Sequence, residues 1–189
     1  MPQSTLYKNQ GMVMVKILDR NFELSYPKEL IAERVKNVAE RLNQDYGGKN
    51  PVMVCILNGA FMFASDLVRY LTFQPEVVFA KVSSYEGMSS TGCVKELIGV
   101  NVDVRARDVI VVEDIVDTGV TMYNLLPQFF SKGAASVKVC TLLQKPECLT
   151  VPLKVDYCAM EIPNAFIVGY GLDYNGMGRN YGDIYTVTE

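Results

Sequence analysis

The sequence predicts an α/β domain with a mainly parallel, twisted sheet that is flanked by helices and carries a small hood lobe. Short and very apolar runs alternate with segments of helical periodicity from about residue 26 to 148. Runs without polar alternation are typical of strands that are buried on both faces of a parallel sheet. The 189 residues, 49% hydrophobic and 21% charged, have the size and composition of one folded domain.

Each element of the predicted core has its own signal. A first helix is predicted between Pro27 and Gly47, because apolar residues recur there at helical spacing. These residues are Leu30, Ile31, Val35, Val38 and Leu42. Continuous apolar runs predict strands at 52–57 and 109–112, and largely apolar stretches predict strands at 77–82 and 137–143. Residues 61–71 and 121–132 have helical patterns.

Two regions interrupt this alternation. Residues 83–95 are rich in glycine, serine and threonine, which favours a mobile loop over a packed element. After Cys148 the strands become shorter and a glycine-rich stretch covers residues 169–178. We therefore expect a core of about residues 26–148, and a hood lobe formed by about residues 1–25 and 149–189.

Charge and composition exclude several classes of function. The net charge of −3 gives no broad basic surface for nucleic acid or anionic membranes. The longest apolar run, residues 52–57, is far shorter than the ~18 residues that a membrane-spanning helix needs. Five cysteines without a C-x-x-C pair, and no secretory signal, predict a cytoplasmic protein. Because the chain lacks histidine, a bound metal should be hard and held by oxygen ligands.

The strongest functional signal lies where the strand at 109–112 ends. Glu113 and Asp114 follow it directly, where carboxylates can accept hydrogen bonds from sugar hydroxyls. Residues 117–121, with sequence DTGVT, begin the next helix and offer backbone N–H groups and two hydroxyls to a phosphate. The alternative is an acidic turn in which Asp117 or Thr118 only caps the helix.

Residues 113–121 resemble the phosphoribosyl pyrophosphate signature of the type I phosphoribosyltransferases, and the chain from about residue 25 onward resembles their hypoxanthine-guanine branch. The resemblance implies that Glu113 and Asp114 hold the ribose hydroxyls of phosphoribosyl pyrophosphate. It implies that Asp117 exchanges a proton with purine N7. It also implies that the turn wraps the 5′-phosphate, with the residues Asp117, Thr118, Gly119, Val120 and Thr121.

Two further segments match this branch. Leu57, Asn58 and Gly59 resemble its pyrophosphate loop, which carries a non-proline cis peptide between its first two residues. The family more often has lysine or arginine at the position of Asn58, so the resemblance implies a backbone role there. Ser84 and Tyr85 resemble the start of a closing loop, which would exclude water from the reacting ribose.

The base and metal sites also follow from the resemblance. Lys145 matches the lysine that donates to the purine 6-oxo group, Phe166 the residue that stacks on the purine, and Ile167 the residue whose main chain contacts the purine edge. Asp173 matches a magnesium ligand, with Glu113 and Asp114 nearby. Arg179 matches an arginine that contacts pyrophosphate.

The implied protein is a purine salvage glycosyltransferase that uses Mg²⁺. It would convert phosphoribosyl pyrophosphate and a 6-oxopurine base into a purine nucleoside monophosphate and pyrophosphate. The bases would be hypoxanthine or guanine, with xanthine left open, and we expect a homodimer or homotetramer.

Other interpretations explain fewer residues. The triplet that begins at Asp117 also occurs in aspartic proteases, but those are all-β proteins and need two copies of it. A non-enzymatic nucleotide- or RNA-binding regulator of the same fold would not need Lys145, Phe166, Asp173 and Arg179 together. The chain has no G-x-x-x-x-G-K-[ST] loop, and Tyr174 stands where a dinucleotide fingerprint needs a third glycine.

Overall fold

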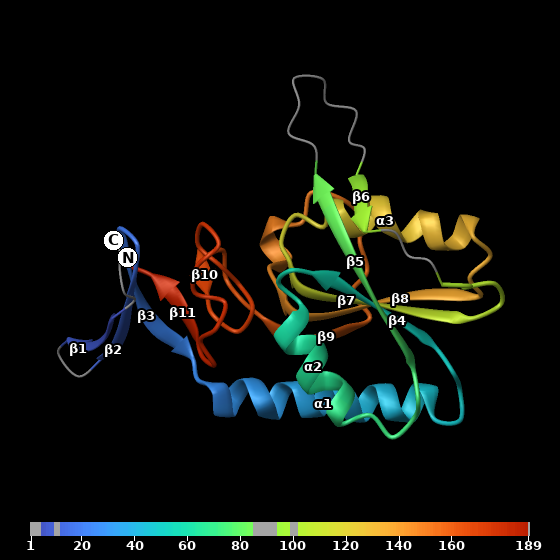
Figure 1. Ribbon diagram of the computed structural model, residues 1–189, viewed down its shortest axis with the longest axis horizontal. Helices are drawn as coiled ribbons and strands as arrows, with labels where there is room; N and C mark the ends of the chain where they lie inside the picture. The colour runs from blue at the N-terminus through green and yellow to red at the C-terminus, as the bar shows by residue number, and fades with distance from the viewer. Residues whose placement is uncertain (1–4, 10–11, 85–93, 99–101, 189) are drawn as a thin grey trace.

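The computed structural model describes the backbone of residues 5–9, 12–84, 94–98 and 102–188, and the side chains of residues 13–82 and 102–188. These residues form two sheets, a large one in the core and a smaller one in the hood (Figure 1). Both termini lie beside the hood sheet, and α1 (Lys28–Tyr46) runs from it along the underside of the core (Figure 1). The chain therefore leaves the hood once, builds the core, and returns.

The core sheet is mainly parallel. In the described residues its order is β6-β5-β4-β7-β8-β9, and only the pairing of β6 with β5 is antiparallel. The strands are β4 (Val52–Leu57), β5 (Glu76–Ser84), β6 (Val94–Ile98), β7 (Asp108–Val116), β8 (Ser136–Gln144) and β9 (Tyr157–Glu161). The predicted α/β fold class is confirmed.

Helices cover both faces of this sheet, as the apolar strands require. On one face α1 and α2 (Phe61–Arg69) pack their buried side chains against Cys55, Ile110 and Leu142. On the other face α3 (Val120–Ser131) packs against Val54, Val111 and neighbouring residues. Helix α1 begins after Pro27, whose carbonyl accepts the N–H of Ile31 at 3.1 Å, and it ends at Tyr46, directly before the predicted stop at Gly47. A short 3₁₀ helix, η1 (Pro146–Cys148), follows β8.

Strand β7 is longer than the predicted run at 109–112. Its pairing with β8 continues through Glu113↔Thr141 and Ile115↔Leu143 to Val116↔Gln144. Glu113 and Asp114, named here the acidic pair, were expected just beyond the strand. They lie within β7 instead, because β8 continues to provide backbone partners. Side chains of adjacent strand residues point to opposite faces, so Glu113 is buried while Asp114 is half-buried.

The hood sheet is antiparallel in the order β1-β2-β3-β11-β10. Its strands are β1 (Thr5–Asn9), β2 (Met12–Ile17), β3 (Arg20–Tyr26), β10 (Ile167–Val168) and β11 (Ile184–Val187). Phe22, Val168 and Tyr185 form its small core. Strand β9 belongs to the core sheet, so within the segment expected in the hood the hood strands begin only at Ile167.

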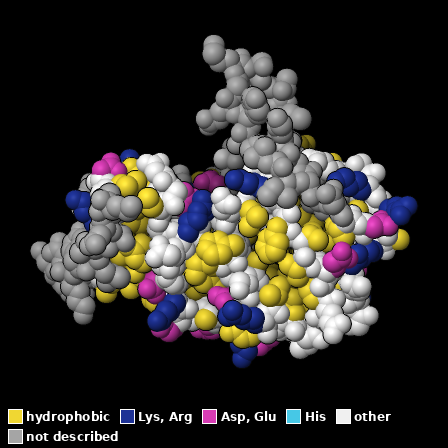
Figure 2. Space-filling model, in the orientation of Figure 1, with side chains coloured by type: hydrophobic (Ala, Val, Ile, Leu, Met, Phe, Trp, Pro, Cys, Tyr) yellow, Lys and Arg dark blue, Asp and Glu magenta, His cyan; other side chains and the backbone are white. Residues whose placement is uncertain are grey.

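The described part of the chain contains no helix that is both long enough and apolar enough to cross a membrane. On the face shown in Figure 2, Lys and Arg side chains are interspersed with Asp and Glu, and hydrophobic side chains lie between them. No single sign of charge dominates this face.

Candidate active site

The acidic pair sits at the carboxyl end of β7, where ligands of open α/β sheets usually bind. Glu113 is only 8% exposed, and its Oε1 accepts the N–H of Asp114 at 3.2 Å. Asp114 accepts the N–H of Ile115 through Oδ1 at 2.8 Å. Burial, followed by the charge of Asp114, raises the pKa of Glu113 well above its usual value. A ligand that donates hydrogen bonds here would relieve this unfavourable burial.

Residues 117–121, named here the phosphate turn, connect β7 to α3. Gly119 precedes the helix with φ of +80°, and the N–H groups of a first helical turn lack intrahelical partners. The carbonyl of Thr118 is fixed from behind by Thr150, which donates its N–H at 3.0 Å and its hydroxyl at 3.3 Å. Thr118 and Thr121 are exposed. This is the arrangement that binds a phosphate at a helix N-terminus.

Residues 57–59, named here the pyrophosphate turn, lie next to the acidic pair. The Leu57–Asn58 peptide bond is cis, as the resemblance implied. A Cβ on Gly59 would lie 1.4 Å from Oδ2 of Asp114, so only glycine fits beside this carboxylate. Asn58 is exposed and Gly59 is buried. The turn therefore presents its backbone directly beside Asp114.

The hood contributes a charged pair to the same place. Arg179 Nη2 lies 2.6 Å from Oδ1 of Asp173, and Oδ2 of Asp173 accepts the N–H of Gly176 at 2.6 Å. Arg179 also donates through Nη1 to the carbonyl of Gly171 at 2.7 Å. Gly171 in turn packs on the backbone of Gly59. These contacts bring Asp173 and Arg179, from the hood, to the pyrophosphate turn of the core.

On the other side of the phosphate turn, a buried lysine is bound to Asp117. Lys145 is 7% exposed, and its Nζ donates to Oδ2 of Asp117 at 2.8 Å and to Oδ1 of Asn164 at 3.4 Å. Its backbone N–H donates to the carbonyl of Val116 at 2.9 Å, which fixes the start of the side chain. The structure thus pairs the predicted proton-exchange residue with the predicted base-selecting residue.

An aromatic side chain lies just beyond this pair along the chain. Phe166 is 45% exposed, and its ring meets that of Tyr174 edge to face at a centroid distance of 5.8 Å. Phe22 supports it at 6.3 Å. The neighbouring Ile167 is buried in β10. An exposed ring held at its edge leaves aromatic surface on which a planar base could stack.

Comparison with known proteins decides the family. The model of the phosphoribosyl transferase domain family matches residues 26–175. The hypoxanthine-guanine phosphoribosyltransferase of Streptococcus thermophilus is 42% identical over 159 residues, which cover 84% of this chain and 88% of that protein. The chain belongs to the hypoxanthine-guanine phosphoribosyltransferase family. The predicted family, enzyme class and purine salvage function are thereby confirmed.

Other relatives of the family agree. The hypoxanthine-guanine-xanthine phosphoribosyltransferase of Tritrichomonas foetus is 39% identical and covers 89% of this chain and 93% of its own. A solved hypoxanthine-guanine phosphoribosyltransferase from Bacillus anthracis superposes with a TM-score of 0.83 at 38% identity, covering 88% of this chain and 96% of that one. A hypoxanthine phosphoribosyl transferase from Trypanosoma cruzi superposes with a TM-score of 0.84 at 36% identity, covering 92% and 94%.

The fold brings most of the predicted phosphoribosyltransferase residues to one end of the core sheet. Ser84 is the last residue of β5 and pairs with Val94 of β6, so both ends of the loop expected at residues 83–95 are strand instead. Tyr85 and the rest of the predicted closing loop lie outside the described residues. The parallel sheet and the helix after Asp117 exclude the aspartic protease, because that fold is all-β. The family relatives favour the enzyme over a non-catalytic regulator.

Three contact residues escaped the sequence analysis. Thr150 holds the carbonyl of Thr118, Asn164 is a partner of Lys145, and Tyr170 joins the hood to α2. A polar residue in a loop gives no signal of this kind on its own. Tyr170 stands between Gly169 and Gly171 in the glycine-rich stretch at residues 169–178, and this was the only available hint.

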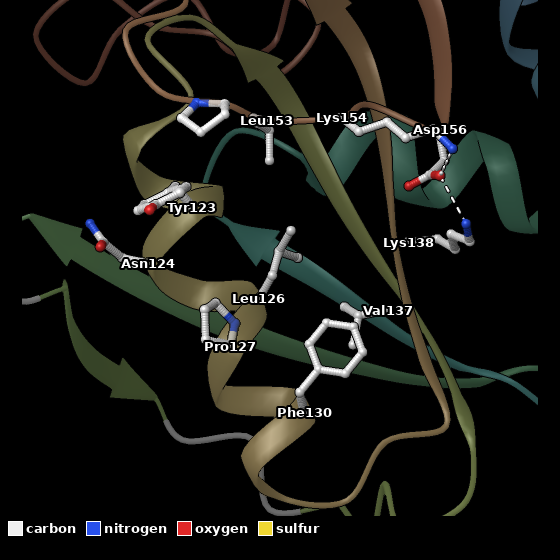
Figure 3. A pocket seen from close by; sticks show the side chains of 11 residues that line it. Tyr123, Asn124, Leu126, Pro127, Phe130, Val137, Lys138, Leu153, Lys154 and Asp156 are labelled. Atoms are coloured by element: carbon white, nitrogen blue, oxygen red, sulfur yellow. Dashed lines mark hydrogen bonds and ion pairs between the residues drawn. The ribbon is translucent and has the colours of Figure 1, made fainter.

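A cavity of about 630 Å³ lies apart from this site, on the outer side of α3 (Figure 3). Tyr123, Pro127 and Phe130 line it from the helix, and Leu153 faces them from the segment after η1. The side chain of Leu153 also packs behind Gly119, since a Cβ there would meet its Cδ2 at 3.3 Å. This cavity contains none of the predicted substrate residues, and its wall supports the phosphate turn from the rear.

Proposed function

We propose that this protein transfers 5-phosphoribose from phosphoribosyl pyrophosphate to N9 of hypoxanthine or guanine, and releases pyrophosphate. The observation that carries the proposal is the pairing of Lys145 with Asp117 at 2.8 Å, directly beside the phosphate turn. A phosphate on this turn would hold the ribose between the acidic pair on one side and the Lys145–Asp117 pair on the other. The ribose and the purine base would then be bound by separate sets of residues.

In the reaction, the bond between ribose C1 and the pyrophosphate oxygen breaks, and a bond from purine N9 to C1 forms. Positive charge that develops on the purine makes its N7 proton more acidic. The side chain of Asp117 is 46% exposed, so a bound base can reach its carboxylate, and Asp117 accepts that proton. Glu113 and Asp114 hold the ribose hydroxyls while C1 changes partner.

Lys145 selects the base. An ammonium group has three donors and no acceptor, so it bonds to the 6-oxo oxygen of hypoxanthine or guanine and not to the amino group of adenine. Lys145 is nearly completely buried, and a buried charge needs polar partners. Asp117 and Asn164 accept two of its three possible hydrogen bonds, which leaves one donor for the 6-oxo oxygen of the base. Phe166 gives the base a stacking surface, and the main chain of Ile167 contacts its edge.

The leaving pyrophosphate is held by the backbone of the pyrophosphate turn and by Arg179. Among the described residues no group of three or more acidic or thiol side chains could enclose a metal alone. This fits magnesium, which is commonly bound through one or two carboxylates together with substrate oxygens and water. Asp173 would hold it, with Glu113 and Asp114 near the sugar. When bound, Mg²⁺ neutralises charge on the leaving group.

The test is the formation of nucleoside monophosphate from phosphoribosyl pyrophosphate with Mg²⁺ and each of four bases: hypoxanthine, guanine, xanthine and adenine. We expect product with hypoxanthine and guanine, and little product with adenine. The result with xanthine shows whether this protein shares the third base named for the Tritrichomonas relative. No product with any 6-oxopurine would reject the proposal. Sedimentation equilibrium tests the expected homodimer or homotetramer.

A further inference from the structure

The hood segment with Asp173 and Arg179 meets the pyrophosphate turn at a close backbone contact. A Cβ on Gly171 would lie 2.1 Å from the carbonyl oxygen of Gly59, so the two backbones touch. Gly171 also exchanges two hydrogen bonds with Arg179: its N–H donates to the Arg179 carbonyl at 3.0 Å, and its carbonyl accepts from Nη1 at 2.7 Å. Whatever fixes Gly171 therefore fixes Arg179 relative to the turn.

Tyr170, the residue before this contact, is anchored to the core. Its side chain is buried, with 4% exposed, and its hydroxyl donates to Oδ2 of Asp66 at 2.6 Å. Asp66 lies on α2, the helix that begins just after the pyrophosphate turn. The hydrogen bond thus joins the hood segment to the element that continues from the turn, and closes a ring of contacts through Gly171 and Gly59.

The backbone of Tyr170 needs such an anchor. Its φ of +46° lies in the left-handed region, which a bulky residue rarely adopts unless its surroundings impose it. Its N–H donates to the carbonyl of Tyr181 at 2.8 Å, so the main chain is held on the hood side. The hydroxyl of Tyr170 supplies the bond on the core side.

We propose that Tyr170 and Asp66 are a positioning pair that presses the segment 169–179 onto the pyrophosphate turn and so sets the affinity for the pyrophosphate end of phosphoribosyl pyrophosphate. Neither residue is among the predicted substrate contacts. The inference rests on the proposed function, because it needs the turn and Arg179 to bind pyrophosphate. Lys145 lies outside this segment, whereas Phe166 meets it at Tyr174, so the effect on the base should be smaller than the effect on pyrophosphate.

The pair can be broken without stranding a buried charge. The side chain of Asp66 is 40% exposed, and its Oδ1 also lies 3.5 Å from the exposed Arg69, a surface pair of little energetic weight. Tyr170→Phe removes only the hydroxyl, and Asp66→Ala removes the acceptor from a solvent-facing position. Asp66→Asn keeps an oxygen that can accept from the tyrosine, so this variant should retain most of the affinity of the unaltered protein for phosphoribosyl pyrophosphate.

The chain contains a matched control. Tyr157 is 5% exposed, and its hydroxyl donates to Oδ2 of Asp45 at 2.5 Å, so Tyr157→Phe breaks the same kind of bond between β9 and α1. For both tyrosines, burial is the main cause that raises the pKa of the hydroxyl, so each remains a donor at neutral pH. Tyr157 and Asp45 have no contact with the pyrophosphate turn among the hydrogen bonds of the described residues.

The experiment measures the Kd of phosphoribosyl pyrophosphate by calorimetry, together with KM for each substrate. Tyr170→Phe and Asp66→Ala should each raise this Kd and the matching KM by roughly tenfold, which is the effect expected when a misplaced Arg179 loses about one charge-assisted hydrogen bond to pyrophosphate. KM for hypoxanthine should stay within about twofold, since Lys145 lies outside the segment and Phe166 is supported by Phe22 as well as by Tyr174. Tyr157→Phe should lower thermal stability without changing either constant, and the double variant Tyr170→Phe with Asp66→Ala should resemble the single ones.

Two results would overturn the inference. One is a Kd for phosphoribosyl pyrophosphate in both Tyr170→Phe and Asp66→Ala that matches the unaltered protein. The other is an equal change in Tyr157→Phe, which would show only general loosening. If the unaltered protein itself neither bound phosphoribosyl pyrophosphate nor made nucleotide, the proposed function would fail, and the inference with it.

Discussion

Lys145→Gln should reduce the preference of the protein for 6-oxopurines over adenine. The substitution exchanges an ammonium group, which only donates, for an amide whose oxygen can accept from the 6-amino group of adenine. With hypoxanthine the variant loses one charge-assisted hydrogen bond, about 1.5 to 3 kcal/mol or roughly 10- to 100-fold in kcat/KM.

The contacts of Lys145 also limit how strongly the protein discriminates against adenine. The ammonium group has two partners in the structure, Asp117 at 2.8 Å and Asn164 at 3.4 Å. When adenine is bound, Lys145 lacks the 6-oxo acceptor but keeps these two partners, although its residue is only 7% exposed. We therefore expect discrimination near the lower end of the roughly 10² to 10⁴ range that a polar mismatch supplies.

The assay is kcat/KM for hypoxanthine, guanine and adenine in the unaltered protein and in Lys145→Gln. Lys154→Gln is the control, because it makes the same chemical change at a side chain that is 82% exposed and pairs with Asp156 at 3.3 Å. The control should leave every ratio unchanged. A hypoxanthine-to-adenine ratio in Lys145→Gln that stayed within about threefold of the unaltered value would refute the role of Lys145.

Further predictions test the other parts of the site. Asp117→Asn should lower kcat by about 10² to 10⁴ while calorimetry finds phosphoribosyl pyrophosphate binding nearly unchanged; a kcat within a few-fold would reduce Asp117 to a helix cap. Gly59→Ala places a Cβ 1.4 Å from Oδ2 of Asp114, so the turn must move, and kcat/KM should fall about 10²-fold in a protein that still folds by circular dichroism. Asp173→Asn should shift the Mg²⁺ concentration for half-maximal rate upward by about tenfold, and an unchanged Mg²⁺ titration would contradict its assignment as a ligand. Cys55 is fully buried, and burial raises the pKa of its thiol to about 12, so a thiol reagent at pH 8 should modify it only after unfolding, as peptide mass spectrometry can determine.

The centre of the core sheet was predictable because strands β4 and β7 contain continuous apolar runs, whereas the outer strands β6 and β9 were not predicted as core strands. Val52–Leu57 and the run at 109–112 leave few alternatives to buried parallel strands, and the helices between them follow from periodicity. The hood was predictable only as a lobe. Its strand β3 pairs with β11, at the other end of the chain, and such a distant pairing leaves no local signal in the residues that form it.

The site divides in a similar way. Glu113, Asp114 and residues 117–121 are adjacent in the chain, so their chemistry could be predicted from the residues themselves. Lys145, Phe166, Asp173 and Arg179 were assigned only because they match a family pattern. The bond between Tyr170 and Asp66 joins residues 104 positions apart, and neither the sequence nor the pattern contains it.

The pairing of Lys145 with Asp117 links base selection to proton exchange. In the structure each group has the other as its partner, so Asp117 shares its Oδ2 with an ammonium donor. A 6-oxopurine offers Lys145 a new acceptor and offers Asp117 a proton on N7, so both groups gain a partner when the base binds. Adenine offers Lys145 nothing to accept its hydrogen bond, and the ammonium group then remains on the carboxylate that should take the proton. An oxygen lone pair that accepts from an ammonium group cannot at the same time accept the N7 proton. Discrimination against adenine should therefore appear in kcat as well as in KM, and a measurement that found it only in KM would mean that the two groups act independently.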